Sequence, residues 1–164
     1  MTHFDDLSAY TYFETESIGH DWGWLEFRPR YDRLNIGWLD APAGFPVGST
    51  PEWFADALRN IAAGPLVNAT RGFHACTFCP RGPNDSPLPV EHPGGAVLRA
   101  NAEIRVPWRT GAMFAAPTLV WHYVRAHSYQ PPESFVDAVG SYDPSWAMDG
   151  SPWIPTDAER LTFD

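Results

Sequence analysis

Two cysteines and a pair of histidines carry the clearest chemical pattern in the 164-residue sequence. Cys76 and Cys79 form a C-x-x-C motif, in which a tight turn lets both thiolates point at one metal ion. Farther along the chain, four residues separate His122 from His127, a spacing that is typical of paired histidine ligands. We therefore predict a zinc site with these four side chains as its ligands.

The match with a compact zinc finger is incomplete. The gap between Cys79 and His122 is 42 residues, whereas compact fingers have about 12–15. Residues i and i+5 also lie about 140° apart on a regular helix, so His127 can share a metal with His122 only if the helix loosens in its last turn. Pro131 and Pro132 lie just downstream and favour an early helix end.

His74 is a competing ligand. It lies two residues before Cys76, so in an extended segment both side chains project to the same side. A Cys2His2 set with His74 in place of His127 therefore stays open. Two other interpretations of the cysteines also stay open: small buried residues that bind no metal, or a redox pair. The redox pair is the weaker of these, because the surrounding residues do not resemble a strand followed by a helix start.

The number of protein ligands decides whether such a zinc ion is structural or catalytic. Four ligands close the coordination shell, whereas three leave a position for water. A catalytic site also needs a general base, and Glu103 is the best carboxylate for that role. The other interpretation places Glu103 on a solvated strand face, paired with Arg105 or Arg109, and we favour it. The motifs of zinc deaminases, H-E-x-x-H proteases and G-x-S-x-G hydrolases are absent, so no catalytic residue can be named.

Composition narrows the classes of partner. The chain has 11 Lys or Arg, all of them Arg, against 20 acidic residues, which gives a net charge of −9. This charge argues against nucleic acid and favours a basic protein or a small ligand. The sequence has no apolar run near the roughly 20 residues of a membrane span, and its acidic N-terminus is unlike a signal peptide. We therefore expect a cytoplasmic protein with no membrane partner. In the reducing cytoplasm a C-x-x-C motif is more often a metal-binding or redox pair than a disulfide.

The hydrophobic pattern predicts one α+β domain over residues 1–140, followed by an irregular tail over 141–164. The domain is expected to hold a small antiparallel sheet and about three helices. We expect an enlarged zinc module built from three parts: the tight turn at Cys76 and Cys79, which we call the knuckle, a hairpin, and the helix that bears the histidines. The expected strands lie at 22–27, at 34–39 and in a hairpin over 102–115, in which Pro107 indicates an edge strand. The expected helices lie at 51–63, 117–126 and 132–139, and Thr50 is expected to cap the first of them.

Several blocks carry a resemblance to a known family. They read RGFHACTFC at 71–79, NAEIRV at 101–106 and APTLVWHYVRAHSYQPPESF at 116–135, with YTYF at 10–13 and NIGWL at 35–39. These blocks resemble a family of small, uncharacterised bacterial proteins, mostly from actinobacteria, over most of residues 4–139. The resemblance implies that knuckle, hairpin and histidine helix belong together, but it implies no substrate or mechanism.

Two functional hypotheses follow. The first is a domain stabilised by a structural zinc ion that acts by binding, in the manner of an acidic immunity or regulatory protein with a basic partner. The second is a zinc-dependent enzyme in which Cys76, Cys79, one histidine and a water molecule hold the metal. The two hypotheses differ in the coordination number of the ion.

Overall fold

The computed structural model describes residues 3–12, 18–20, 23–25, 32–64, 66–69, 72, 74–82 and 100–147. Among these, β1 (Ile18–His20) and β2 (Gly23–Leu25) pair as a two-stranded antiparallel sheet. The main sheet has three strands in the order β3 (Asp32–Asn35), β5 (Ala112–Pro117) and β4 (Glu103–Arg109). Most of the predicted tail lies outside the described residues, so the division at residue 140 remains a prediction.

The main sheet is mixed rather than antiparallel throughout. The predicted hairpin is present, because β4 and β5 pair antiparallel, and β4 is the edge strand that Pro107 indicated. However, β3 pairs with β5 in parallel. The chain between these two strands is long and includes a helix, and such a crossover is what a parallel pair requires. The α+β class is thus confirmed, and the antiparallel direction of the third strand is corrected.

The helices follow the predicted order with shifted starts. The first, α1 (Glu52–Ala62), buries one apolar face. Its capping position is held by Pro51 with no side-chain hydrogen bond, so the prediction of a Thr50 cap is wrong. The second, α2 (Val120–His127), begins later than predicted because Pro117 ends β5. It is followed by α3 (Glu133–Gly140) and the short α4 (Pro144–Ala147).

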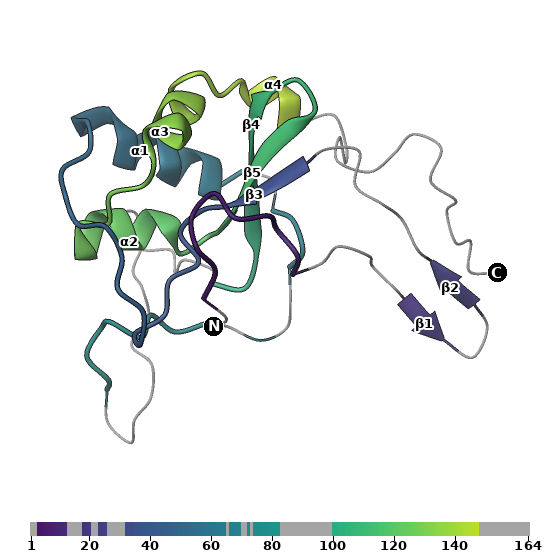
Figure 1. Ribbon diagram of the computed structural model, residues 1–164, viewed down its shortest axis with the longest axis horizontal. Helices are drawn as coiled ribbons and strands as arrows, with labels where there is room; N and C mark the ends of the chain where they lie inside the picture. Colours follow the sequence, from purple (N-terminus) through teal and green to yellow (C-terminus); the bar gives the residue numbers. More distant parts are fainter. Residues whose placement is uncertain are drawn as a thin grey trace.

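The two faces of the sheet have different coverings. In Figure 1 the helices α1, α2 and α3 gather on one side of the sheet. On that side Ile104, Val106 and Phe114 join apolar side chains of all three helices in the main core. On the other face Tyr10 and Trp38 form a smaller cluster with Ala115. The alternation along β4 separates these faces, since neighbouring residues on a strand point in opposite directions.

Segments outside the strands protect both edges of the sheet. Near the N-terminus, Tyr10 donates its backbone N–H to Arg33, and Asn35 donates its own to Ser8, so this stretch runs along β3. At the other edge, Val67 and Glu103 exchange both of their backbone hydrogen bonds. These contacts satisfy backbone groups that an open edge would expose.

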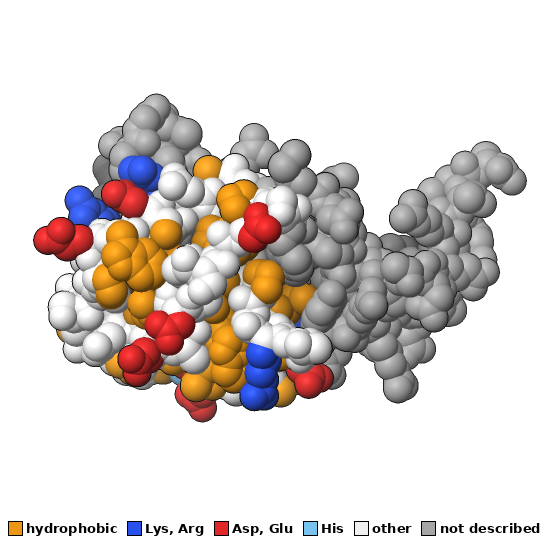
Figure 2. Space-filling view, turned by 90° about the horizontal axis from the view of Figure 1, so that it is seen from above, with side chains coloured by type: hydrophobic (Ala, Val, Ile, Leu, Met, Phe, Trp, Pro, Cys, Tyr) orange, Lys and Arg blue, Asp and Glu red, His pale blue; other side chains and the backbone are white. Residues whose placement is uncertain are grey.

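The surface of the described residues mixes acidic and apolar groups. Figure 2 shows one face, on which acidic side chains lie among hydrophobic ones. The large apolar side chains that remain exposed come from separate segments of the chain and are Leu7, Tyr12, Val47, Trp53 and Trp108. Among the described helices, none has the length and apolar character needed to cross a bilayer.

Gly37 occupies a position that other residues cannot adopt without strain. Its φ is +67°, and a Cβ built there would lie 2.7 Å from Cγ2 of Val120 at the start of α2. We expect Gly37→Ala to lower the free energy of unfolding by more than about 1 kcal/mol, because both the backbone and the packing oppose a side chain. Urea unfolding measures this change. Gly44→Ala is the control, since a Cβ at Gly44 meets no atom within 4 Å; equal effects of the two substitutions would refute the explanation.

Candidate metal centre

The cysteines lie on a knuckle within the irregular segment 74–82. The backbone N–H groups of Phe78 and Cys79 donate hydrogen bonds to the sulfur of Cys76. Such bonds favour the thiolate form, which is the form that binds metals. The knuckle is also tied to the rest of the fold, because the N–H of Ala41 donates to Oγ1 of Thr77 at 3.0 Å. Both cysteines are free thiols.

The last turn of α2 is wider than a regular α-helical turn. The backbone N–H of Ser128 bonds to the carbonyl of Tyr123, five residues earlier, and the N–H of Tyr129 reaches the same carbonyl at 3.1 Å. A bond of this i→i−5 type belongs to a π turn, in which residues five apart lie closer to one face. The loosening that His127 needs in order to meet His122 is therefore present.

Contacts beyond α2 hold this wide turn in place. Ser128 adopts a left-handed conformation with φ of 53°. Its carbonyl accepts the N–H of Gly48, and the N–H of Gln130 bonds to the carbonyl of Pro46 at 2.9 Å. The segment around residue 47 thus pairs with the chain that leaves α2. This pairing fixes the direction in which the helix ends.

The four predicted ligands converge at one point. Nε2 of His127 lies 3.3 Å from the sulfur of Cys76, 3.4 Å from that of Cys79 and 3.2 Å from Nε2 of His122. Nε2 of His122 lies 3.3 Å from the sulfur of Cys79. All four donor atoms fall within 4.8 Å of one another, so the cluster is compact enough to hold a metal ion.

These separations match those between ligands on one tetrahedral ion. Zinc–sulfur bonds of about 2.3 Å and zinc–nitrogen bonds of about 2.0–2.1 Å place neighbouring donors about 3.3–3.8 Å apart in a tetrahedron. The observed separations of 3.2–3.4 Å lie at or just below that range. The donor set of two thiols and two imidazoles is also the one that zinc prefers in structural sites.

Aromatic side chains shield the cluster from water on its inner side. The ring of Phe78, between the two cysteines in sequence, lies 5.6 Å from that of His127 and 5.9 Å from that of Tyr123. Phe45 packs against Phe78 with ring centroids 5.0 Å apart. Cys76 and His122 are buried. An apolar shell of this kind strengthens the attraction between a cation and its ligands.

Burial shifts the pKa values of Cys76, His122 and His127. It lowers the pKa of His122 to about 4, with a further contribution from His127, and it also lowers the pKa of His127. Both imidazoles are thus neutral at pH 7, with a lone pair free for a metal. Burial raises the pKa of the Cys76 thiol to about 11. A divalent cation would displace the thiol proton, so metal binding would release protons.

Comparison with known proteins gives a family and no activity. A model of the family described as Domain of unknown function (DUF7919) matches residues 2–140. The chain belongs to this family. No curated protein and no solved structure matches the chain. The matched region contains all four residues of the cluster, so the candidate metal centre is part of the DUF7919 domain.

His74 does not join the cluster in this DUF7919 domain. It is exposed, and its side chain lines a separate cavity instead. The alternative ligand set with His74 in place of His127 is therefore not supported by the structure. We expect His74→Ala to leave the metal content of the purified protein unchanged, as measured by elemental analysis. Loss of metal in this variant would return His74 to the ligand set.

Glu103 also does not belong to the metal cluster. The prediction that it lies on a solvated strand face is wrong, because its side chain is buried, but its predicted pairing with Arg105 is present at 2.6 Å. It accepts further hydrogen bonds from Tyr10 and Asn68. These two partners were not predicted from the sequence, because they lie far from Glu103 along the chain. Glu103 is not one of the four residues of the metal cluster. The best candidate for a general base is therefore not available at that site.

Proposed function

We propose that this DUF7919 domain binds one zinc ion through Cys76, Cys79, His122 and His127, and that the role of the ion is structural. The convergence of four protein donors on one point carries the proposal. Four such ligands complete a tetrahedral shell and leave no position for a catalytic water. The location of Glu103 in another part of the fold gives further support to a structural role.

Zinc is the ion favoured by the chemistry of the donors. Thiolates are soft ligands that magnesium and calcium bind poorly, and imidazole suits zinc, copper, iron and nickel. A tetrahedral set of two sulfurs and two nitrogens is typical of structural zinc.

The ion would join two parts of the chain that are distant in sequence and that also meet through the ring contact of Phe78 with Tyr123. The knuckle at 76–79 consists of turns, and α2 is a helix of only 8 residues. Short isolated helices are marginal in water and depend on tertiary contacts. A bound ion would hold the knuckle against the C-terminal end of α2, so that metal binding and folding are coupled.

A binding role toward a basic protein completes the proposal. It is supported by the net charge of −9 and by the acidic side chains that lie among apolar ones in Figure 2. Interactions of this kind depend on complementary charge, which steers two proteins together. The expected signature is an association with a basic protein that weakens as ionic strength rises. Association that is insensitive to salt would argue against this part of the proposal.

Elemental analysis tests the zinc proposal. We expect protein purified without added metal to contain about one zinc ion per chain, as a single Cys2His2 site requires. Cys79→Ser and His122→Ala each remove one ligand, so both variants are expected to lose most of that zinc. His74→Ala is the matched control, because it changes a histidine close to the knuckle but outside the cluster. A folded wild-type protein that contains no metal would refute the proposal.

A further inference from the structure

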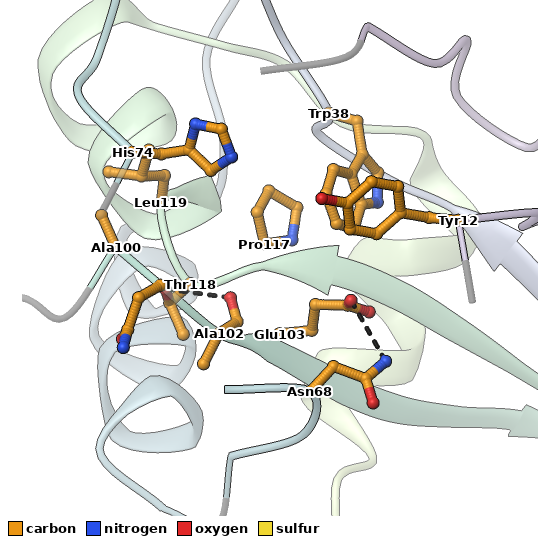
Figure 3. A pocket seen from close by; sticks show the side chains of 11 residues that line it. Tyr12, Trp38, Asn68, His74, Ala100, Ala102, Glu103, Pro117, Thr118 and Leu119 are labelled. Carbon is orange, nitrogen blue, oxygen red and sulfur yellow. Dashed lines mark hydrogen bonds between the residues drawn. The ribbon is translucent and has the colours of Figure 1, made fainter. Parts of the chain in front are cut away.

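A groove runs between α1 and the residues that follow α3. Apolar side chains line it from both sides, and these are Ala57, Ile61, Val139, Tyr142 and Pro144. Its volume is about 240 Å³, whereas the cavity beside Glu103 in Figure 3 has about 30 Å³ and room only for water. Since a cavity of about 150 Å³ can hold a benzene molecule, the groove can receive apolar side chains of a partner.

An exposed tryptophan extends this apolar surface along α1. Trp53 lies four residues before Ala57, so both side chains share one face of the helix. Its ring lies against the end of α3, because a Cβ built at Gly140 would meet it at 3.1 Å. Trp53 is nevertheless 47% exposed. A large exposed aromatic side chain beside an apolar groove is typical of a protein interface.

The segments that build the groove carry negative charge. Residues 52–64 and 133–144 contain five acidic residues and one arginine, and all five acidic residues are exposed. In Figure 1, α1, α3 and α4 lie toward the top of the molecule, and Figure 2 looks onto that side. There, acidic side chains lie around patches of hydrophobic ones.

Three of these acidic residues lie beside the groove itself. Glu52 and Asp56 share one row of α1 with Asn60, which lines the groove. Asp143 lies directly between two lining residues on the other side. The arginine of these segments, Arg59, pairs with Asp56 at 3.3 Å. The rim therefore keeps a net negative charge on both sides of an apolar floor.

Charge also decides between the possible occupants of the groove. The C-terminal residues 148–164 contain four acidic residues and one arginine, so they would meet like charge there. A second copy of the chain brings a net charge of −9 and would meet like charge as well. A basic partner would gain attraction from the same rim.

The walls of the groove favour a helical partner. Their backbone groups are already paired, since the N–H groups of Gly64 and Tyr142 bond to the carbonyls of Ile61 and Val139. An extended segment laid in the groove would bury backbone groups without partners, which is costly. A helix pairs its backbone groups internally and can insert one apolar face into a groove of this kind.

We propose that this groove binds a basic amphipathic helix of a partner protein. An apolar row of that helix enters the groove and lies against Trp53, while flanking lysine or arginine side chains face Glu52, Asp56 and Asp143. The inference rests on the proposed binding to a basic protein and assigns a surface to it. None of the four residues of the metal cluster lines the groove, so this interface uses no metal ligand.

Fluorescence anisotropy of a labelled peptide, titrated with the full chain, tests this proposal. The probe is a peptide of about 14 residues in which leucines form one face of a helix and lysines the other. A scrambled peptide of the same composition has the same charge but no apolar face. We expect the amphipathic peptide to bind at least about fivefold more tightly than the scrambled one. Its affinity should decrease as ionic strength rises.

Trp53→Ala tests the apolar part of the groove. We expect this variant to bind the amphipathic peptide at least about fivefold more weakly, as the loss of a central interface tryptophan does. Tyr12→Ala is the matched control, because Tyr12 is exposed to a similar extent, at 43%, and packs against Trp38 on the other face of the sheet. Circular dichroism checks that both variants are folded. Equal losses in the two variants would overturn the assignment of the groove.

A pair of neutral substitutions tests the acidic rim. Glu52→Gln combined with Asp143→Asn is expected to weaken peptide binding and its dependence on salt. Asp5→Asn combined with Asp32→Asn removes the same charge from exposed positions outside the groove and is expected to have a smaller effect. Equal effects of the two pairs would mean that the peptide responds only to overall charge, which would overturn the proposed site.

The same titrations separate this inference from the proposal on which it rests. Equal, salt-sensitive binding of both peptides, unchanged in Trp53→Ala, would overturn the groove and leave the basic partner in place. No binding of either peptide would overturn both. A dimer in analytical ultracentrifugation that Trp53→Ala dissociates would make a second copy the occupant. Tighter peptide binding by Trp153→Ser would make the C-terminal residues the occupant, and either of these results would overturn the inference.

Discussion

Removal of the metal is expected to lower the melting temperature of the protein by about 10 °C or more. Structural zinc contributes its binding free energy to folding, and a ligand present at a thousand times its dissociation constant stabilises a protein by about 4 kcal/mol. For a chain of this size each kcal/mol corresponds to about 2–4 °C. Differential scanning calorimetry before and after treatment with a chelator measures the change.

Cys76→Ser supplies the matched comparison. The variant replaces the buried sulfur of Cys76 by a smaller oxygen, so it removes one of the four proposed ligands with a small change in side-chain shape. We expect its melting temperature to match that of the chelated wild type, and we expect the chelator to have no further effect on it. If the chelator left the wild type unchanged, the ion would not be structural. If it lowered the melting temperature of Cys76→Ser equally, the effect would not arise at this centre.

Truncation of Arg105 is expected to cost about 3–5 kcal/mol of unfolding free energy. Arg105 and Glu103 are both buried, and the pair is linked at 2.6 Å. Removing one partner of a buried ion pair leaves an uncompensated charge, which is the source of this cost. Arg105→Met keeps most of the apolar volume of the side chain. The decrease in unfolding free energy therefore measures the effect of the missing charge and not that of a cavity. Urea unfolding monitored by tryptophan fluorescence measures it.

A double-mutant cycle separates the pair from its surroundings. Glu103→Gln combined with Arg105→Met removes both charges, and we expect the double variant to be more stable than Arg105→Met alone. The hydrogen bonds from Tyr10 and Asn68 can still reach an amide oxygen at position 103. Strictly additive effects of the two substitutions would contradict the assignment of an energetically coupled pair.

Sequence patterns were sufficient for the elements that depend on local chemistry. Pro51 and the apolar stripe that follows it predicted α1, and the alternation in 102–115 predicted the β4–β5 hairpin. The C-x-x-C motif and the histidine spacing identified the four residues that the fold brings together. These features are local because periodicity, hairpin turns and the spacing within each ligand pair involve residues that are near one another in sequence.

Features that depend on contacts between distant parts of the chain were harder to predict from the sequence. The parallel direction of β3 follows from how a long crossover packs, which no short pattern encodes. The choice of His127 over His74 depends on the wide turn at Ser128, which is held by Pro46 and Gly48, some 80 residues away. Likewise, the burial of Glu103 involves the segments that bear Tyr10 and Asn68, whose side chains bond to its carboxylate from distant parts of the sequence.

X-ray absorption spectroscopy at the zinc edge is the sharpest test of the proposed zinc centre. On the protein as purified, we expect an edge signal from zinc with two sulfur neighbours at about 2.3 Å and two nitrogen neighbours at about 2.0–2.1 Å. The scattering pattern of imidazole should accompany the nitrogen shell. A first shell with fewer than two sulfurs, or with an oxygen from water in place of one imidazole, would contradict a structural site built from Cys76, Cys79, His122 and His127.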